Sequence, residues 1–244
     1  LSGTFLTETG DYRYLEGMKS GKQLFLSSFD GKQAYLFVAT LGADERLSGK
    51  FYSGTTWKED WTARHNEAFK LNDPEKITYL KNKEEKINFS FPNLDKQPVT
   101  LNDKKFDNKV VIIQVMGSWC PNCMDESVYL SSVYRQFRDQ GLEVVALAFE
   151  KTSDFEKARA LLFRMKTRLK MDYEVLVTLQ SGSAQASETF PALNKISAFP
   201  TTIFLNREHR VVKIHTGFSG PATGKDYETY KEQTEILIKN LLKD

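Results

Sequence analysis

Two residues, Cys120 and Cys123, combine a reactive side chain with a spacing that suits chemistry. They are the only cysteines of the chain, and they follow an apolar run over residues 110–116 that predicts a buried strand. At the first turn of a following helix, such a pair can form a disulfide or stand as two thiols, which is the redox arrangement expected in a βαβ context. One disulfide closing so short a loop would add little stability, so we expect a chemical role for the pair.

The start of that helix would make the first cysteine the more reactive one. The first turn of a helix carries unpaired N–H groups and a partial positive charge, and both favour a thiolate. Such surroundings lower the pKa of a cysteine from about 8.5 to roughly 3.5–7.5. Pro121 suits the first helical position, where a missing N–H costs nothing. We therefore expect Cys120 to attack and Cys123, one turn deeper, to resolve the mixed disulfide.

Other uses of a cysteine pair find less support in the sequence. A zinc site needs further ligands, and the three histidines stand in unrelated places, namely His65, His209 and His215. Haem attachment needs a histidine directly after the second cysteine, where this chain has Met124. We therefore expect neither a metal nor a cofactor.

The composition places the chain among ordinary soluble proteins. It has 244 residues, 40% of them hydrophobic and 27% charged, with a net charge of +2. No clustered basic segment suggests nucleic-acid binding, and no apolar run is long enough to span a membrane. Because the chain starts at Leu1 rather than at a methionine, we expect that a leader has been removed or the sequence trimmed.

Residues 1–85 are predicted to form a β-rich N-terminal domain of unknown role. Alternating apolar and polar residues predict strands over 11–16, 22–28, 33–39 and 47–53, with a hairpin turn at Asp30-Gly31. Trp57 and Trp61 could share one helix face, either covering the sheet edge or docking a partner. The highly charged segment 72–86 is interpreted as the connection to the next domain.

Residues 86–244 are predicted to form an α/β domain. A small hairpin over 87–101 precedes strands over 110–116, 143–149, 173–177, 201–205 and 210–215. Helices are expected over 121–140, 153–170 (capped by Thr152 or Ser153) and 225–242, and some helical character is expected before Leu193. The apolar side of the first helix should include Val128. Alternating units imply a central mixed sheet flanked by helices, with an antiparallel hairpin at one edge.

This order of elements, with Trp119-Cys120-Pro121-Asn122-Cys123 opening the first helix, resembles the thioredoxin-like proteins. It is most similar to the extracytoplasmic thiol–disulfide oxidoreductases of the TlpA/ResA type. The resemblance covers residues 87–244 and is carried by the Trp-Cys-Pro-Asn-Cys motif, Glu126, Glu150 and the segment Ala198-Phe199-Pro200-Thr201-Thr202. Residues 1–85 look like the N-terminal extension of some members of this group.

The resemblance gives Phe199 and Pro200 a place in the site. An X–Pro bond is ordinarily trans, and a proline at the start of a strand is tolerated. In thioredoxin-like folds, however, the proline before this strand is cis and faces the cysteine pair. We therefore expect a cis Phe199–Pro200 bond, beside which an extended substrate segment could pair with the backbone.

Three further residues are supporting candidates. Glu126 is either a surface carboxylate at the helix start or, by resemblance, a group that shapes recognition or proton transfer. Glu150 ends a strand that should be buried. It either has a raised pKa and relays a proton to Cys123, or is solvated at the end of the sheet. Trp119 is expected to cover the disulfide, because an indole N–H can only donate.

The resemblance implies a thiol–disulfide oxidoreductase with a redox disulfide between Cys120 and Cys123. Its expected partners are a protein disulfide or dithiol and an upstream electron donor, and its expected direction is reduction. However, the Pro121-Asn122 dipeptide differs from that of thioredoxin and leaves the potential open. The expected location is extracytoplasmic and periplasmic, with a lipid or membrane anchor only if one preceded Leu1.

Two alternatives to this function stay open. A peroxiredoxin-type thiol peroxidase shares the fold, but the segment before Cys120 lacks the proline that its peroxide loop needs. The other alternative is a non-catalytic binding module with an inert disulfide.

Overall fold

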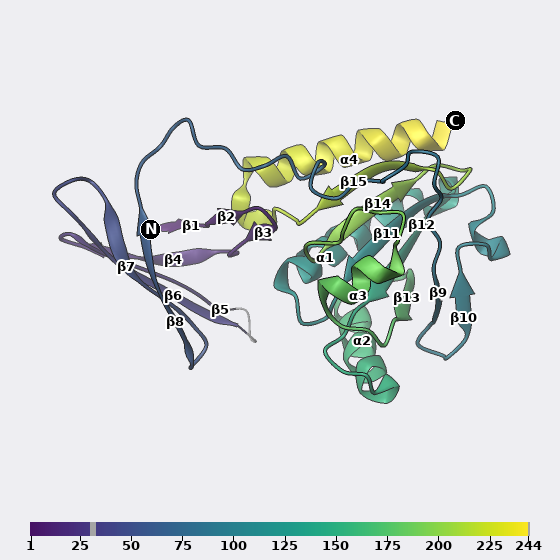
Figure 1. Cartoon of the computed structure of the whole chain (residues 1–244), viewed down its shortest axis with the longest axis horizontal. Helices are drawn as coiled ribbons and strands as arrows, with labels where there is room; N and C mark the ends of the chain where they lie inside the picture. The colour runs from purple at the N-terminus through teal and green to yellow at the C-terminus, as the bar shows by residue number, and fades with distance from the viewer. Residues whose placement is uncertain (30–32, 244) are drawn as a thin grey trace.

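The computed structural model describes residues 1–29 and 33–243 and places two sheets side by side along the long axis of the molecule (Figure 1). In the first, antiparallel sheet the strand order is β1-β4-β5-β6-β7-β8. The bounds of these strands are Ser2–Gly3, Leu15–Ser20, Gln23–Phe29, Ala34–Leu41, Leu47–Ser53 and Trp57–Ala63. The β-rich character predicted for this part of the chain is confirmed.

The first predicted strand is interrupted. Arg13 has a φ of 59°, a left-handed conformation that breaks an extended chain. As a result, β3 (Gly10–Asp11) pairs with β2 (Leu6–Thr7) as a separate hairpin, and β4 begins only at Leu15. The hairpin turn predicted at Asp30-Gly31 lies outside the described residues, although the flanking β5 and β6 do pair antiparallel.

Aromatic side chains hold one face of this sheet together. The rings of Phe37 and Phe51 stack with centroids 4.4 Å apart, and Phe5 packs on Phe37 at 4.7 Å. Trp61 also contacts Phe37, at 5.9 Å. Trp57 and Trp61 lie on β8 rather than on a helix, because β8 pairs along its whole length with β7. Trp61 thus packs on the sheet, whereas Trp57 is exposed.

The second sheet is mixed, in the order β13-β12-β11-β14-β15. Its bounds are Glu174–Val177, Leu142–Ala148, Val110–Met116, Thr201–Leu205 and Val211–Thr216. Neighbours β11, β12 and β13 are parallel, while β14 and β15 add an antiparallel hairpin, as predicted. The small hairpin before it is formed by β9 (Ser90–Pro92) and β10 (Pro98–Thr100).

Helices cover both faces of this sheet. On one face, β11 side chains pack in a cluster with α1 (Pro121–Phe137), α2 (Phe155–Leu169) and α4 (Lys225–Lys243). On the other face, they pack with α3 (Gly182–Thr189) and the β9–β10 hairpin. Short 3₁₀ helices complete the domain, η1 (Lys104–Phe106), η2 (Arg138–Gln140) and η3 (Pro221–Thr223). Every side chain of β11 is therefore buried, as its continuous apolar run predicts.

Some helix details differ from the prediction. Asp154, and neither Thr152 nor Ser153, caps α2, because its side chain accepts from the Lys157 N–H at 3.1 Å. Val128 is 51% exposed rather than part of the apolar side of α1. The predicted end of the first helix is confirmed, since Gly141 follows η2 with a φ of 106°.

The charged segment between the two sheets packs on the second one. Leu80 forms a β-bridge with Leu193, and the Thr78 and Thr216 hydroxyls lie 2.8 Å apart in a buried hydrogen bond. The Thr216 N–H also donates to Pro74 O. This segment thus lines the edge of the second sheet at β15. The domain boundary at residue 85 stays a prediction.

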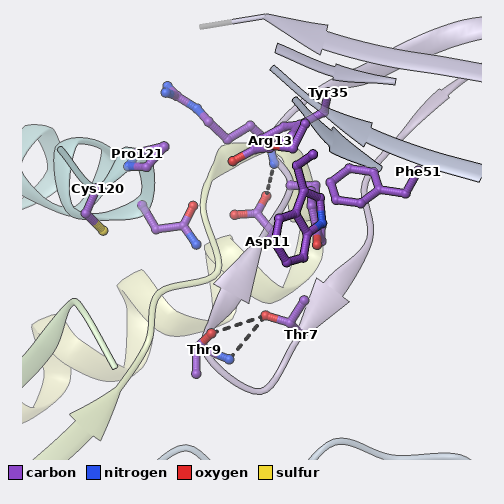
Figure 2. Close-up of a pocket in the computed structure, with 12 residues that line it drawn as sticks. Thr7, Thr9, Asp11, Arg13, Tyr35, Phe51, Cys120 and Pro121 are labelled. Carbon is purple, nitrogen blue, oxygen red and sulfur yellow. Dashed lines mark hydrogen bonds between the residues drawn. The ribbon is translucent and has the colours of Figure 1, made fainter. Parts of the chain in front are cut away.

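The β2–β3 hairpin links the two sheets. Gly10 forms a bridge with Phe218, and the Gly220 N–H donates to the Asp11 carboxylate at 3.3 Å. Figure 2 shows Thr7, Thr9 and Asp11 of this hairpin near the start of α1. Gly10 has a φ of 146°, and a Cβ there would overlap the Asn122 amide, so this approach requires glycine.

The packing of the second sheet yields a test of its core. Phe106 is fully buried, so Phe106→Ala should lower the free energy of unfolding by about 3–5 kcal/mol. Phe163 of α2 is 57% exposed and serves as the matched control, for which we expect a change below about 0.5 kcal/mol. Urea unfolding followed by circular dichroism measures both. Equal effects of the two variants would contradict this account of the core.

Candidate active site

The two cysteines lie where β11 ends and α1 begins. The chain leaves β11 at Met116, turns through Gly117–Trp119, and places Cys120 at the N-cap of α1 with Pro121 as the first helical residue. The Cys120 N–H donates to Gly117 O at 3.1 Å, which closes the turn. The junction predicted from the sequence is thus present.

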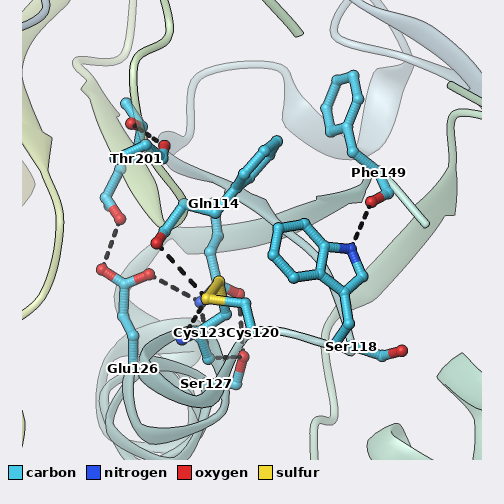
Figure 3. Close-up of a disulfide and its surroundings, with 12 residues drawn as sticks. Gln114, Ser118, Cys120, Cys123, Glu126, Ser127, Phe149 and Thr201 are labelled. Atoms are coloured by element: carbon cyan, nitrogen blue, oxygen red, sulfur yellow. Dashed lines mark hydrogen bonds between the residues drawn. A yellow bond between two sulfur atoms is a disulfide. The ribbon is translucent and has the colours of Figure 1, made fainter. Parts of the chain in front are cut away.

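Cys120 and Cys123 form a disulfide, with Cα atoms 5.2 Å apart (Figure 3). The Cys123 N–H donates to Cys120 Sγ at 3.2 Å, so one free N–H of the helix start points at this sulfur. Cys120 keeps 6% of its surface exposed, whereas Cys123 is fully buried. A partner sulfur can therefore approach Cys120 but not Cys123.

Phe199 and Pro200 directly precede β14, and Phe199 lies against the disulfide. The Phe199–Pro200 bond is cis, which confirms the expectation drawn from the resemblance. Phe199 O lies 3.4 Å from Cys120 Sγ. The structure therefore brings the Phe199 backbone next to Cys120, although the two residues are about 80 positions apart in sequence.

Trp119 packs beside the disulfide. Its Nε1–H donates to Phe149 O at 2.9 Å, and its ring contacts Phe199 edge-on with centroids 5.5 Å apart. The Lys151 ammonium lies 4.5 Å from the centre of the indole. These contacts fix the indole orientation and agree with a covering role.

Glu126 is fully buried, so its interpretation as a surface carboxylate is wrong. Its carboxylate accepts from Gln114 Nε2 at 2.8 Å and from the Thr202 hydroxyl at 2.6 Å. Burial raises the pKa of Glu126 to about 7, although these hydrogen bonds act in the opposite direction. This carboxyl can therefore hold or release a proton near neutral pH, one helical turn beyond Cys123.

Gln114 connects Glu126 to the second cysteine, a contact that was not predicted from the sequence. Its Nε2 lies 3.4 Å from Cys123 O, and its Oε1 accepts from the Ser127 hydroxyl at 3.1 Å. The Ser127 hydroxyl also lies 2.8 Å from Cys123 O, so its one proton can be donated to either acceptor. The signal in the sequence was one polar residue inside the apolar run of 110–116.

Glu150 is also buried, so the solvated alternative is wrong. Its carboxylate accepts from the Ser118 N–H at 2.6 Å and from the Ser118 hydroxyl at 2.7 Å. Neither of these hydrogen bonds leads to Cys123. Glu150 therefore braces the turn before Cys120, a contact that was not predicted from the sequence.

The N-terminal part of the chain also contacts the helix start. In the amide orientation that satisfies both its polar atoms, Asn122 donates to Asp11 O at 3.1 Å and accepts from the Asp11 N–H at 3.0 Å. The Arg13 guanidinium forms an ion pair with Asp125 at 2.7 Å. No residue before 85 was expected at the site. No sequence signal could have shown these contacts, because the first of them involves backbone atoms.

The described part of the chain offers no ready site for a metal ion. Within residues 1–29 and 33–243, no three His, Cys, Asp or Glu side chains gather as metal ligands would. In the same part of the chain, no helix has the length and apolarity that a membrane span requires.

Buried Glu126 predicts a distinct pH dependence of stability. Its pKa is higher in the folded chain than the ordinary value of 4.5, so folding is favoured while the carboxyl keeps its proton. The parent should therefore lose stability between about pH 4.5 and 7, by an amount of the order of 3 kcal/mol at 1.4 kcal/mol per pKa unit. Glu126→Gln should lack this loss.

Urea unfolding of both proteins at several pH values from 4 to 8.5 measures the effect. We expect the stability of Glu126→Gln relative to the parent to rise through this window, whatever its constant offset. A difference that does not change with pH would contradict the assignment.

Comparison with known proteins places this site in a family. Residues 81–231 match the Redoxin family. A thiol-disulfide oxidoreductase ResA of Bacillus cereus is 31% identical over 154 residues, which cover 63% of this chain and 75% of the relative. ResA of Halalkalibacterium halodurans is 24% identical over 139 residues, or 55% of this chain and 68% of the relative.

A solved structure shares the fold of this part of the chain. The secreted thiol-disulfide isomerase of Corynebacterium glutamicum superposes with a TM-score of 0.51 at 19% identity, over 72% of this chain and 99% of that one. The Redoxin match spans more than half of the 244 residues, and the Bacillus cereus relative agrees with it. The chain belongs to the Redoxin family, as a thioredoxin-like thiol–disulfide oxidoreductase of the ResA type.

Proposed function

We propose that the protein reduces disulfides of partner proteins, with Cys120 as the attacking thiol and Cys123 as the resolving one. The observation that carries this proposal is the unequal burial of the two sulfurs at the start of α1. Cys120 is reachable beside the Phe199 backbone, and Cys123 is enclosed behind it.

In the first step, the Cys120 thiolate attacks one sulfur of the substrate disulfide. A bond forms between Cys120 and that sulfur, the substrate S–S bond breaks, and the second substrate sulfur leaves as a thiolate that takes up a proton. The N-terminus of α1 favours the attacking thiolate, because the Cys123 N–H is directed at Cys120 Sγ.

In the second step, Cys123 attacks Cys120 Sγ and releases the first substrate sulfur. The Cys120–Cys123 disulfide forms as the mixed disulfide breaks, so two electrons have passed to the substrate. Cys123 must lose its proton first, and Glu126 is the nearby carboxyl whose pKa of about 7 suits that transfer. A dithiol donor then returns two electrons to Cys120–Cys123.

Supporting residues position these steps. Phe199 presents backbone atoms with which an extended substrate segment can pair, and Trp119 packs against Phe199. Pro200 holds the cis bond after Phe199, and its own carbonyl oxygen already accepts from the Gly217 N–H at 2.8 Å. Pro121 opens the helix, and Glu150 holds the preceding turn through Ser118. Glu150 is thus assigned a positioning role here in place of a proton relay.

We also propose a domain organisation and a cellular location for the protein. Residues 1–85 form a β-rich domain, and residues 86–244 form the thioredoxin-like domain that carries the disulfide. The resemblance to ResA proteins supports an extracytoplasmic site of action, where a partner supplies the electrons.

Serine variants of the two cysteines test the mechanism. With a peptide disulfide as substrate and dithiothreitol as donor, we expect Cys120→Ser to lose at least about 100-fold in rate, because the attacking sulfur is gone. Cys123→Ser, first reduced and then freed of dithiothreitol, should instead accumulate a mixed disulfide that mass spectrometry detects at Cys120. Reduction at the parent rate by Cys120→Ser would refute the assigned roles.

A peroxide assay separates the peroxidase alternative. We expect no consumption of hydrogen peroxide that depends on Cys120 alone. Peroxide turnover by Cys123→Ser, together with no reduction of the peptide disulfide by the parent, would favour the peroxidase.

A further inference from the structure

A cavity of about 510 Å³ lies between the N-terminal sheet and the start of α1. Cys120 and Pro121 lie on its helix side, and Tyr35 and Phe51 of the first sheet lie opposite (Figure 2). Asn122 also lines the cavity. Its volume is within the range of about 300–1,000 Å³ that is typical of ligand pockets. The reactive cysteine therefore borders a cavity that residues outside the Redoxin match help to build.

The two walls of this cavity are held together by specific contacts. The Asn122 amide makes two hydrogen bonds with the backbone of Asp11, and Arg13 pairs with Asp125 on α1. Asn122 lies between the two cysteines in sequence, so the β2–β3 hairpin is joined to the motif itself. The cavity is thus part of the folded structure rather than a gap between unconnected domains.

The cavity wall that faces away from α1 is largely aromatic. Tyr12, Tyr35, Phe51 and Trp57 supply the aromatic surface, and Ser53 supplies a hydroxyl group. Trp57 is 60% exposed, an unusual state for so large an apolar ring. Nearer to α1, the charge of the Arg13 guanidinium is balanced by its ion pair with α1.

This surface is distinct from the backbone beside Pro200. Neither Phe199 nor Pro200 lines the cavity, whereas Phe199 O contacts Cys120 Sγ. A substrate whose sulfur reaches Cys120 therefore meets the Phe199 backbone and, in addition, the aromatic wall. Residues that flank the substrate cysteine are the ones that can enter the cavity.

We propose that this cavity recognises an aromatic side chain near the reactive cysteine of a protein substrate. Aromatic rings pack favourably on one another, and the aromatic wall offers four rings within one cavity beside the reactive sulfur. The N-terminal sheet would thus determine which disulfides the oxidoreductase accepts. This inference rests on the proposed disulfide-exchange function.

Paired peptides test the proposal with the full chain. Each peptide carries one cysteine in a mixed disulfide with 2-mercaptoethanol, and phenylalanine or alanine stands at one of the two positions on either side. Chromatography follows the release of the peptide thiol. We expect the phenylalanine peptide to react about tenfold faster than the alanine peptide at one or more of these positions. Equal rates for all pairs would overturn the proposal.

Variants of Trp57 show whether the cavity causes this preference. In Trp57→Ala the ratio of the two rates should fall to about twofold or less, whereas Trp57→Phe should keep most of it. Phe69→Ala is the matched control, because Phe69 is 68% exposed and does not line the cavity. An unchanged ratio in Trp57→Ala would also overturn the proposal, even if both rates fell.

Reduction of a small disulfide without aromatic groups shows whether the recognition proposal or the proposed disulfide-exchange function has failed. If the parent reduces hydroxyethyl disulfide but shows no preference among the peptides, only the recognition proposal fails. If it reduces neither hydroxyethyl disulfide nor any peptide, the proposed exchange function fails with it. A rate for glutathione disulfide equal to that of the best peptide would also contradict recognition of an aromatic residue.

Discussion

The interaction on which the site depends is the contact between Cys120 Sγ and the Cys123 N–H at the start of α1. The Cys123 N–H reaches this sulfur only because α1 begins directly after the turn that leaves β11. Glu150 fixes that turn through both the N–H and the hydroxyl of Ser118. β11 itself is fixed by burial on both faces. The reactivity assigned to Cys120 is therefore a consequence of how the central strand is packed.

Burial of Glu126 lowers stability at a position where we propose a role in proton transfer. A carboxyl placed in an apolar core is costly to ionise, which is why its pKa rises to about 7. Gln114 and Thr202 reduce this cost by donating hydrogen bonds from two neighbouring strands. The same arrangement leaves a carboxyl near Cys123 that can exchange a proton at neutral pH. We infer that the buried Glu126 carboxyl lowers the stability of the fold at neutral pH.

Sequence patterns predicted those elements whose structure depends on residues close together in the chain. The apolar run of β11, the proline at the helix start and Gly141 at the helix end each indicate their own structure. The buried hydrogen bonds of Glu126 could not be predicted, because one of them comes from Thr202, which is 76 residues away in sequence. The break at Arg13 and the contact between Asn122 and Asp11 likewise depend on how the N-terminal sheet docks. Only the three-dimensional arrangement shows these contacts.

The rate of alkylation of the reduced protein as a function of pH tests the central claim most directly. Iodoacetamide reacts with thiolates, and mass spectrometry of the digested protein assigns the modified cysteine. We expect Cys120 to be alkylated first, with an apparent pKa below the ordinary value of about 8.5, while Cys123 is protected. Preferential alkylation of Cys123, or a Cys120 thiol that titrates at or above about 8.5, would contradict the reactivity assigned to the start of α1.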